Sequence, residues 1–475
     1  MHPILRTCVF LSFLLLPAAP ALAVDVAPVT PVAPVTPPVT QQASVALRAG
    51  AGTIGSGGCG TATKPCQQTT LAARRLTMQL APVDPGGAQA VQVERLHRAP
   101  GTRAYRARPT LAAQLAPDGS GALSLAVKTV LAGPGSWCYR LVAAPTDTAA
   151  GATSPWRCIR YRPTISIGWV GDTAMGSRAY GLPPGDGRNM FANVLDELRA
   201  PDLMVGNYEG TLSSGGSPRC SGGPLCFIFQ APQRMASGLR HAGFDVMNLA
   251  NNHGLDMGAN ARSQTIQALT SRKIAVTGLP GQITIKQVAD TRVALVGFGF
   301  NPGMMDLDDM ATVRSIVTQA SKRADVVVAI MHSGTEGSAA ARVPGGDEDG
   351  RGRTRLFVKT AIDSGADIVF GSGPHVVRGI EQRRGRLAFY STGNFAGWRQ
   401  FTRSGLGAQS GIVTVDVDYP GTIDHADWQS ITLRGPGIPY VDRSGSIVRR
   451  VRELSRQDFG TRSPQITSRG RITIR

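Results

Sequence analysis

Short polar groups at the ends of apolar stretches are the part of this sequence that could carry chemistry. Six such groups occur between positions 171 and 395: Gly171-Asp172, Asn207-Tyr208-Glu209, Asn251-Asn252-His253, His332-Ser333-Gly334-Thr335-Glu336, Pro374-His375 and Ser391-Thr392-Gly393-Asn394-Phe395. Carboxylate oxygens, amide oxygens and imidazole nitrogens together suit Mn, Fe, Zn or Mg rather than a soft-metal thiolate site. A divalent ion held by such donors polarises a carbonyl or phosphoryl oxygen and lowers the pKa of a bound water to about 7.

Each group by itself also has an ordinary structural explanation. A Gly-Asp or Asn-Asn pair after a strand is a common turn signal. A single histidine at a strand end is more often a hydrogen-bonded surface residue than a metal ligand. The occurrence of all six groups in one stretch of chain, from Asp172 to Asn394, is what favours a shared metal site.

Apolar and amphipathic stretches alternate after Pro163 and predict an α/β domain. We expect strands at 165–170, 203–205, 244–249, 293–298, 325–331 and 367–370, and helices near 188–200, 232–242, 257–271, 308–322 and 352–364. Stretches 387–391 and 411–418 resemble strands that close a second sheet. Because ligands in open α/β sheets bind at the carboxyl ends of strands, this fold would gather the polar groups. Residues 441–475 are basic and polar, and we expect them to form a loosely ordered tail.

In this order, the polar groups resemble the pattern of the CapA family of poly-γ-glutamate and capsule biosynthesis proteins. The most specific parts are Asn251-Asn252-His253 with Asp256 and Gly258, and the blocks Gly373-Pro374-His375-Val376 and Ser391-Thr392-Gly393-Asn394-Phe395. The resemblance covers slightly over half of the chain. It implies a two-sheet, calcineurin-like metallophosphatase sandwich over residues 163–440, and a role in making or processing poly-γ-glutamate or another anionic capsule polymer.

The resemblance also implies roles for single residues. Five match candidate metal-ligand positions: Asp172, Glu209, Asn252, His332 and His375. His253 matches the place of a general acid, and Glu336 is the second catalytic candidate. Three more are candidates for substrate binding: Asn207, Ser372 and Asn394.

Three positions depart from the family pattern. A true metallophosphatase begins with Asp-x-His, whereas Ala174 stands two residues after Asp172. Many relatives have histidine at the position of Ser372, and the family often has tryptophan at the position of Ser333. A hydroxyl is a far poorer metal ligand than an imidazole. We therefore expect one ion rather than two, with a metal-free protein as the alternative.

These observations leave two classes of function open. The first is a metal-dependent hydrolase or transferase acting on an anionic polymer, since cleavage of a γ-glutamyl amide needs a polarised carbonyl and an activated water. The second is a non-catalytic accessory protein that binds nascent polymer or a membrane-bound synthase. An ordinary phosphoesterase is a third reading, which the absence of Asp-x-His disfavours.

The N-terminal residues are typical of an export signal. His2 and Arg6 precede an apolar stretch at 9–16, and Ala21-Leu22-Ala23 supplies a cleavage site, which gives a signal peptide over residues 1–23. The apolar stretch is shorter than the roughly 20 residues that span a bilayer; an uncleaved anchor is the alternative. We expect an exported protein, periplasmic or extracellular at the cell surface. Residues 24–43 repeat Pro, Thr and Val and predict an extended linker.

Seven cysteines are present, and one of them, Cys8, lies within the signal. An even set of six in an oxidising compartment predicts disulfides. Their local spacing favours three pairs: Cys59 with Cys66, Cys138 with Cys158, and Cys220 with Cys226. A zinc site is the competing interpretation, but the sequence has no CxxC pair.

Residues 66–162 contain short alternating stretches separated by Pro- and Gly-containing turns, and they predict a small β-sandwich. The stretch 136–143 resembles a strand of a fibronectin III-like or Ig-like domain, with an unrelated small β domain as the alternative. This region has no catalytic constellation, so binding or spacing is its expected role.

The formal net charge of +18 comes mostly from arginine and would attract a polyanion such as poly-γ-glutamate or an acidic glycan. Arginine spread over solvated faces is the plainer explanation of the same charge. Because the basic residues are scattered and no nucleic-acid-reading motif accompanies them, we expect no nucleic-acid partner.

Overall fold

The computed structural model describes residues 45–49, 52–53, 69–71, 75–80, 91–99, 110–115, 126–130, 134–143, 152–153, 156–223, 226–346 and 348–475. The predicted signal peptide at 1–23, the linker at 24–43 and the Cys59–Cys66 pair lie outside these residues. No helix of the described residues combines the length and the apolar character needed to cross a membrane.

The described strands before residue 162 form two sheets. The first has the order β2-β1-β4-β7, with bounds Gly52–Thr53, Val45–Ala49, Arg75–Leu80 and Ala126–Val130. The second has the order β3-β10-β8-β5-β6, with bounds Thr69–Leu71, Arg157–Tyr161, Gly135–Ala143, Val91–Arg98 and Thr110–Leu115, and β9 (Ala152–Thr153) pairs with β8. The predicted disulfide between Cys138 and Cys158 is present and joins β8 to β10. The fibronectin III-like or Ig-like sandwich stays a prediction.

The first sheet of the following α/β domain is mixed. Four neighbouring strands are parallel: β11 (Ile165–Ala174), β12 (Leu203–Tyr208), β15 (Val246–Asn248) and β16 (Ala275–Thr277). On the other side of β11 the sheet continues antiparallel through β25 (Gln409–Asp418) and β26 (Thr422–Arg434). Two short strands pair at the sides: β24 (Asn394–Gly397) with β11, and β27 (Ile438–Val441) with β26.

The second sheet has the order β17-β18-β20-β21-β23-β22, and β19 (Met305–Asp306) pairs with β18. Its bounds are Thr284–Val288, Thr291–Gly299, Val326–His332, Ile368–Ser372, Arg386–Phe389 and Ile380–Arg383. Strands β18, β20, β21 and β23 are parallel. Consequently β11, β12, β15, β20 and β21 all offer carboxyl ends at which polar side chains can collect.

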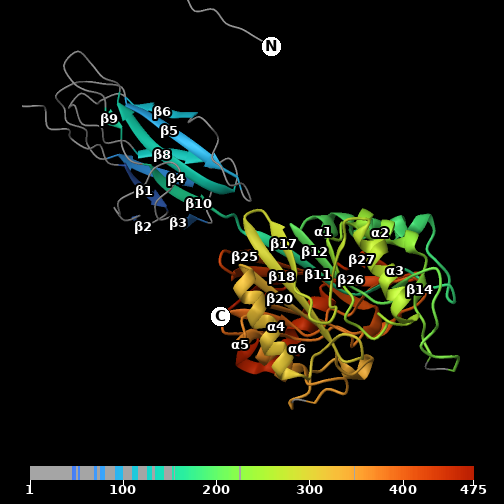
Figure 1. Cartoon of the computed structure of the whole chain (residues 1–475). Helices are drawn as coiled ribbons and strands as arrows, with labels where there is room; N and C mark the ends of the chain where they lie inside the picture. The colour runs from blue at the N-terminus through green and yellow to red at the C-terminus, as the bar shows by residue number, and fades with distance from the viewer. Residues whose placement is uncertain are drawn as a thin grey trace, which may run out of the picture. The chain divides into compact units, whose positions relative to one another are not determined.

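The two sheets pack face to face around one apolar core. Alternate residues of each strand point into it, so that Trp169 of β11 stacks on Phe370 of β21 with ring centroids 5.2 Å apart. The outer face of the first sheet is covered by α1 (Leu195–Arg199), α2 (Ala236–Ala242) and α3 (Gly258–Thr270), and that of the second by α4 (Met310–Arg323) and α5 (Thr354–Asp363) (Figure 1). The predicted α/β class is therefore confirmed.

Two local predictions need correction. The expected helix near 188–200 is mostly a 3-10 helix at Gly185–Val194, interrupted by left-handed Asp186 and Gly187, and only α1 is α-helical. Stretch 387–391 lies in the second sheet as expected, as β23, whereas stretch 411–418 forms β25 of the first sheet. Both stretches are apolar enough to suit either sheet, and only chain topology decides between them.

The expected loose tail at 441–475 was also wrong. This segment forms α6 (Ser446–Phe459), β28 (Gln465–Ile466) and β29 (Arg471–Thr473). Ile447, Val448 and Val451 lie on one face of α6 and enter the core between the sheets, while the arginines occupy the other faces. The high arginine content hid this amphipathic pattern.

Candidate metal centre

The carboxyl ends of four strands bring the polar groups of the sequence together. Asp172 lies near the end of β11, Glu209 directly follows β12, and His332 and Ser372 are the last residues of β20 and β21. His375 comes from the loop after β21 and has a left-handed backbone conformation, with φ of 59°. This conformation is uncommon for a residue with a side chain and is retained where the surroundings demand it.

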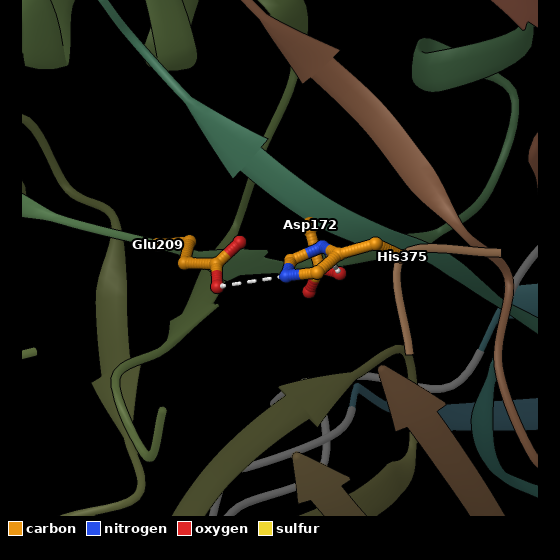
Figure 2. Close-up of side chains that lie close together, drawn as sticks. All are labelled: Asp172, Glu209 and His375. Carbon is orange, nitrogen blue, oxygen red and sulfur yellow. Dashed lines mark ion pairs between the residues drawn. The ribbon is translucent and has the colours of Figure 1, made fainter. Parts of the chain in front are cut away.

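Asp172, Glu209 and His375 form the one group among the described residues whose ligand atoms all lie within 4.8 Å of one another. Figure 2 shows the three side chains converging. His375 Nδ1 lies 3.0 Å from Asp172 Oδ2, and His375 Nε2 lies 3.8 Å from Glu209 Oε1. Both carboxylates are fully buried, and His375 is partly exposed. Two carboxylates and an imidazole in this arrangement suit a divalent ion.

The surroundings of the Glu209 carboxylate indicate whether a cation fits this cluster. Neither of its carboxylate oxygens accepts a hydrogen bond from the described residues, although the side chain is fully buried. Burial, with the charge of Asp172 beside it, raises the pKa of Glu209 well above its ordinary value. A buried carboxylate without donors is costly unless a positive charge compensates it, so this residue fits a bound cation.

Asp172 is the best-supported anion of the cluster. Burial opposes its ionisation, but hydrogen bonds from His375 and Asn207 and the charges of His375 and His332 lower its pKa to about 2. Asn207 Nδ2 donates to Asp172 Oδ1 at 2.9 Å. Asp172 is therefore ionised at neutral pH, as a metal ligand must be.

His332 and His375 differ in charge because their surroundings differ. Burial lowers the pKa of His332 to about 3, which keeps its imidazole neutral. Burial also opposes protonation of His375, but Glu209 and Asp172 outweigh it and raise the pKa of His375 to about 10. His332 has the form that ligates a metal, whereas ligation by His375 requires release of a proton.

His332 is held by hydrogen bonds on both ring nitrogens. Its Nε2 lies 2.8 Å from Asn252 Oδ1, and its Nδ1 lies 3.0 Å from Ser372 Oγ. The same ring lies 3.6 Å from Asp172 and 3.7 Å from Glu209. All five predicted ligand residues are thus in one cluster, although the metal roles of His332 and Asn252 stay predictions.

The three residues predicted to bind substrate are buried and contact the candidate ligands. Asn207 bonds to Asp172 and lies 3.2 Å from His332 Nδ1, Ser372 bonds to His332, and Asn394 Oδ1 lies 2.8 Å from His375 Nδ1. Asn248 and Asn251, which were not predicted as site residues, donate to Asn207 Oδ1 at 2.9 and 3.1 Å. The Asn-Asn-His group of the sequence could have indicated Asn251. No sequence pattern indicated Asn248, because it belongs to strand β15.

His253 also approaches Glu209, with Nε2 4.0 Å from Glu209 Oε1. Its Nδ1 lies 2.7 Å from Asp256 Oδ2. Burial lowers the pKa of His253 although Asp256 opposes this, so the imidazole is neutral at neutral pH. Asp256 was not predicted as a site residue. Its position three residues after His253 in the same motif could have indicated it.

Glu336 and Arg351 lie at the exposed edge of the cluster. Glu336 is about half exposed, and its Oε1 lies 3.7 Å from His375 Nε2 and 2.5 Å from Arg351 Nη1. Arg351 also donates to the carbonyl oxygens of Gly334 and Gly373, at 2.8 and 2.5 Å. Nothing in the sequence marked Arg351, because its loop meets the site only through the tertiary fold.

Ala174, the last residue of β11, has no side-chain atom that could bind a metal. It packs in an apolar cluster with Phe229, Phe401, Ala408 and Leu433. Where a metallophosphatase has the histidine of Asp-x-His, this chain therefore has an apolar residue, Ala174, packed among other apolar side chains.

Comparison with known proteins identifies relatives of this chain. Residues 166–397 match the family described as bacterial capsule synthesis protein PGA_cap. The PGA biosynthesis protein CapA of Bacillus subtilis is 28% identical over 264 residues, covering 51% of this chain and 66% of the relative. The capsule biosynthesis protein CapA of Bacillus anthracis is 27% identical over 271 residues, covering 52% and 64%. The matched region thus spans just under two thirds of these relatives. Among solved structures, a putative 5'-nucleotidase from Staphylococcus aureus is similar with a TM-score of 0.37 and 17% identity, over 62% of this chain and 58% of that one.

Proposed function

This chain belongs to the CapA family of bacterial capsule synthesis proteins, and we propose that it is an exported, metal-dependent hydrolase or transferase acting on an anionic capsule polymer. Poly-γ-glutamate is the first candidate substrate, because the names of the relatives refer to PGA and capsule biosynthesis. An acidic glycan is the alternative substrate. The net charge of +18 favours either polyanion.

The observation that carries the proposal is the buried carboxylate of Glu209, which accepts no hydrogen bond from the described residues, beside Asp172 and His375. A fold retains a buried acidic cluster at a cost of several kcal/mol when nothing compensates it. A cation held by these three residues removes that cost. His332 and Asn252 are close enough to complete the donor set.

A divalent ion bound there supplies a Lewis acid for the scissile carbonyl and acidifies a water. His253 would then move the proton. Because Asp256 engages Nδ1, the proton-accepting Nε2 of the neutral ring faces Glu209 and the cluster. We assign Asn207, Ser372 and Asn394 to positioning, since their hydrogen bonds go to Asp172, His332 and His375.

The export part of the proposal has independent support. The disulfides Cys138–Cys158 and Cys220–Cys226 suit an oxidising compartment.

Polymer cleavage tests the proposal directly. Purified mature protein is incubated with poly-γ-glutamate and Mn²⁺, Zn²⁺ or Mg²⁺, and chain length is followed by size-exclusion chromatography. We expect shortening of the polymer that EDTA abolishes and that Asp172→Asn and His253→Gln each reduce by at least about a hundredfold. Intact polymer under all metal conditions contradicts a hydrolase acting on this substrate; the same assay with an acidic glycan separates the two substrate classes.

A non-catalytic accessory role is the second candidate function. One observation favours it: two candidate ligands already have hydrogen-bond partners, His332 with Asn252 and His375 with Asn394. Under this alternative the protein would bind the polymer or a membrane-bound synthase without cleaving it. Polymer binding that persists in Asp172→Asn and in EDTA, with no change of chain length, is its expected result.

A further inference from the structure

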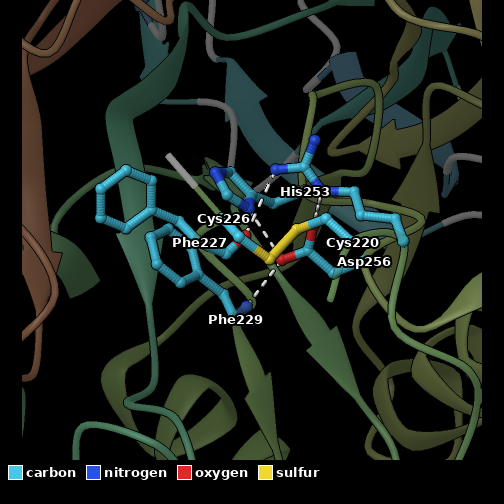
Figure 3. Close-up of a disulfide and its surroundings, with 7 residues drawn as sticks. Cys220, Cys226, Phe227, Phe229, His253 and Asp256 are labelled. Carbon is cyan, nitrogen blue, oxygen red and sulfur yellow. Dashed lines mark hydrogen bonds and ion pairs between the residues drawn. A yellow bond between two sulfur atoms is a disulfide. The ribbon is translucent and has the colours of Figure 1, made fainter. Parts of the chain in front are cut away.

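A disulfide-closed segment packs directly on the His253–Asp256 pair (Figure 3). It belongs to the connection between β13 (Thr211–Leu212) and β14 (Gln230–Ala231), two short strands that pair in parallel. The Cys220–Cys226 disulfide joins the two arms of this connection. Arg219 precedes the first cysteine, and Phe227 and Phe229 follow the second.

Both carboxylate oxygens of Asp256 are held by these two arms. Asp256 Oδ1 forms an ion pair with Arg219 Nε at 2.7 Å. Asp256 Oδ2 accepts a hydrogen bond from the backbone N–H of Phe229 at 2.6 Å and lies 2.7 Å from His253 Nδ1. The backbone N–H of Arg219 also donates to the Asp256 carbonyl oxygen at 2.9 Å. Asp256 is fully buried, so its charge depends on these partners.

The same arms fix the imidazole ring. Phe229 stacks on His253 with ring centroids 4.0 Å apart and planes 15° apart. Arg219 Nη2 donates to the carbonyl oxygen of Phe227 at 3.3 Å, which ties the first arm to the second. Of the described contacts to the His253 ring, the stacking therefore comes from Phe229 in the second arm, and the contact to Nδ1 comes from Asp256, which both arms hold.

We propose that Arg219 is a positioning residue for His253, and that the Cys220–Cys226 disulfide holds it in place. Arg219 keeps the Asp256 carboxylate turned so that Oδ2 meets Nδ1, which leaves Nε2 towards Glu209. The Arg219 side chain is about one third exposed, and an ion pair open to water is weak unless its geometry is held. The disulfide supplies that geometry, because it joins the two arms that carry Arg219 and Phe229.

This inference rests on the proposed function of His253 for its catalytic consequence, but its structural part can be measured without activity. The full chain is labelled with ¹⁵N-histidine, and the ring nitrogen signals of His253 are assigned with His253→Gln. We expect one Nδ1-protonated tautomer in the wild type. In Arg219→Gln and in Cys220→Ser/Cys226→Ser we expect tautomer exchange, with kcat for polymer cleavage lowered on the order of tenfold and KM and metal content unchanged.

Two controls separate positioning from folding. Cys138→Ser/Cys158→Ser removes the other described disulfide and should leave the His253 signals unchanged. Arg219→Lys keeps the charge and should restore most of the lost rate. If the double cysteine variant does not fold, the His253 signals and kcat of Arg219→Gln decide whether Arg219 positions His253. Wild-type His253 signals and wild-type kcat in folded Arg219→Gln overturn the proposal. If the wild type cleaves nothing, the proposed function fails, and the tautomer measurement still decides the positioning role.

Discussion

At the scale of single residues, the site contains three buried or half-buried histidines with different proton affinities. Burial dominates at His332 and lowers its pKa to about 3. At His375 the two neighbouring carboxylates outweigh burial and raise the pKa to about 10. At His253 burial outweighs the opposing effect of Asp256 and lowers the pKa. In one cluster, His332 is thus a neutral candidate ligand, His375 carries a proton that a metal would displace, and His253 is a neutral base.

Glu209→Gln should remove most of the stabilisation that a metal gives the protein. Ligand that binds only the folded state at a hundred times its Kd adds about 2.7 kcal/mol to the free energy of unfolding. We expect this gain in the wild type and less than about 1 kcal/mol in Glu209→Gln, measured by urea unfolding with Mn²⁺ or EDTA. Glu336→Gln, at the exposed edge, is the control and should keep the gain. Equal gains in wild type and Glu209→Gln would contradict a ligand role for Glu209.

His332 should make the metal-free protein less stable in acid. The unfolded chain takes up a proton near the ordinary pKa of 6.5, whereas buried His332 resists protonation until about 3. Its contribution to stability is therefore complete above 6.5 and is lost as the pH falls from 6.5 towards 3. One such group gives a slope of up to about 1.4 kcal/mol per pH unit. Urea unfolding in EDTA should show a shallower slope for His332→Gln, and an identical slope would refute this assignment.

The strand-end residues could be predicted from sequence because each polar group directly follows an apolar stretch. Asp172, Glu209, His332 and His375 needed only the rule that strand ends gather in an α/β sheet. Arg219 and Arg351 could not be predicted in this way, because loops bring them to the site through tertiary contacts. The hydrogen bonds of Asn207, Ser372 and Asn394 likewise depend on side-chain packing that spacing does not encode.

At the scale of elements, the strands with continuous apolar runs were the most predictable. Residues of β18, β20 and β21 are buried on both faces, since one face meets the other sheet and one meets α4 and α5. Elements whose identity depends on context were less predictable. The segment at 188–200 is largely 3-10, and α6 was hidden by its arginines because only one of its faces is apolar.

Ile447→Ala in α6 should lower the free energy of unfolding by about 2–5 kcal/mol, because it leaves a cavity in the core between the sheets. Arg449→Ala, on the exposed face of the same helix, is the control and should change it by less than about 0.5 kcal/mol. Chemical denaturation of the purified variants measures both. Equal, small effects of the two substitutions would mean that the C-terminal segment does not support the core.

At the scale of the whole molecule, the site depends on both sheets of the α/β domain. Asp172 and Glu209 come from the first sheet, and His332 and Ser372 end strands of the second. The cluster therefore forms only when the two sheets pack. Among the residues whose side chains the structure describes, the apolar core between them begins at Ile165.

A fragment of residues 163–475 should fold and keep the site. All residues of the cluster and all members of the core between the sheets lie within it. We expect the fragment to unfold cooperatively and to bind metal with the stoichiometry of the mature protein, as measured by calorimetry and metal analysis. Aggregation of the fragment, or a loss of its metal, would show that the preceding β strands are needed.

The metal content of the purified mature protein tests the central claim most directly. Elemental analysis after metal loading and desalting should find about one divalent ion per chain. Asp172→Ala and His375→Ala should lose it, whereas His425→Ala, outside the cluster, should keep it. A folded wild-type protein that retains no ion, or variants that retain it as well as the wild type, would contradict a metal centre formed by Asp172, Glu209 and His375.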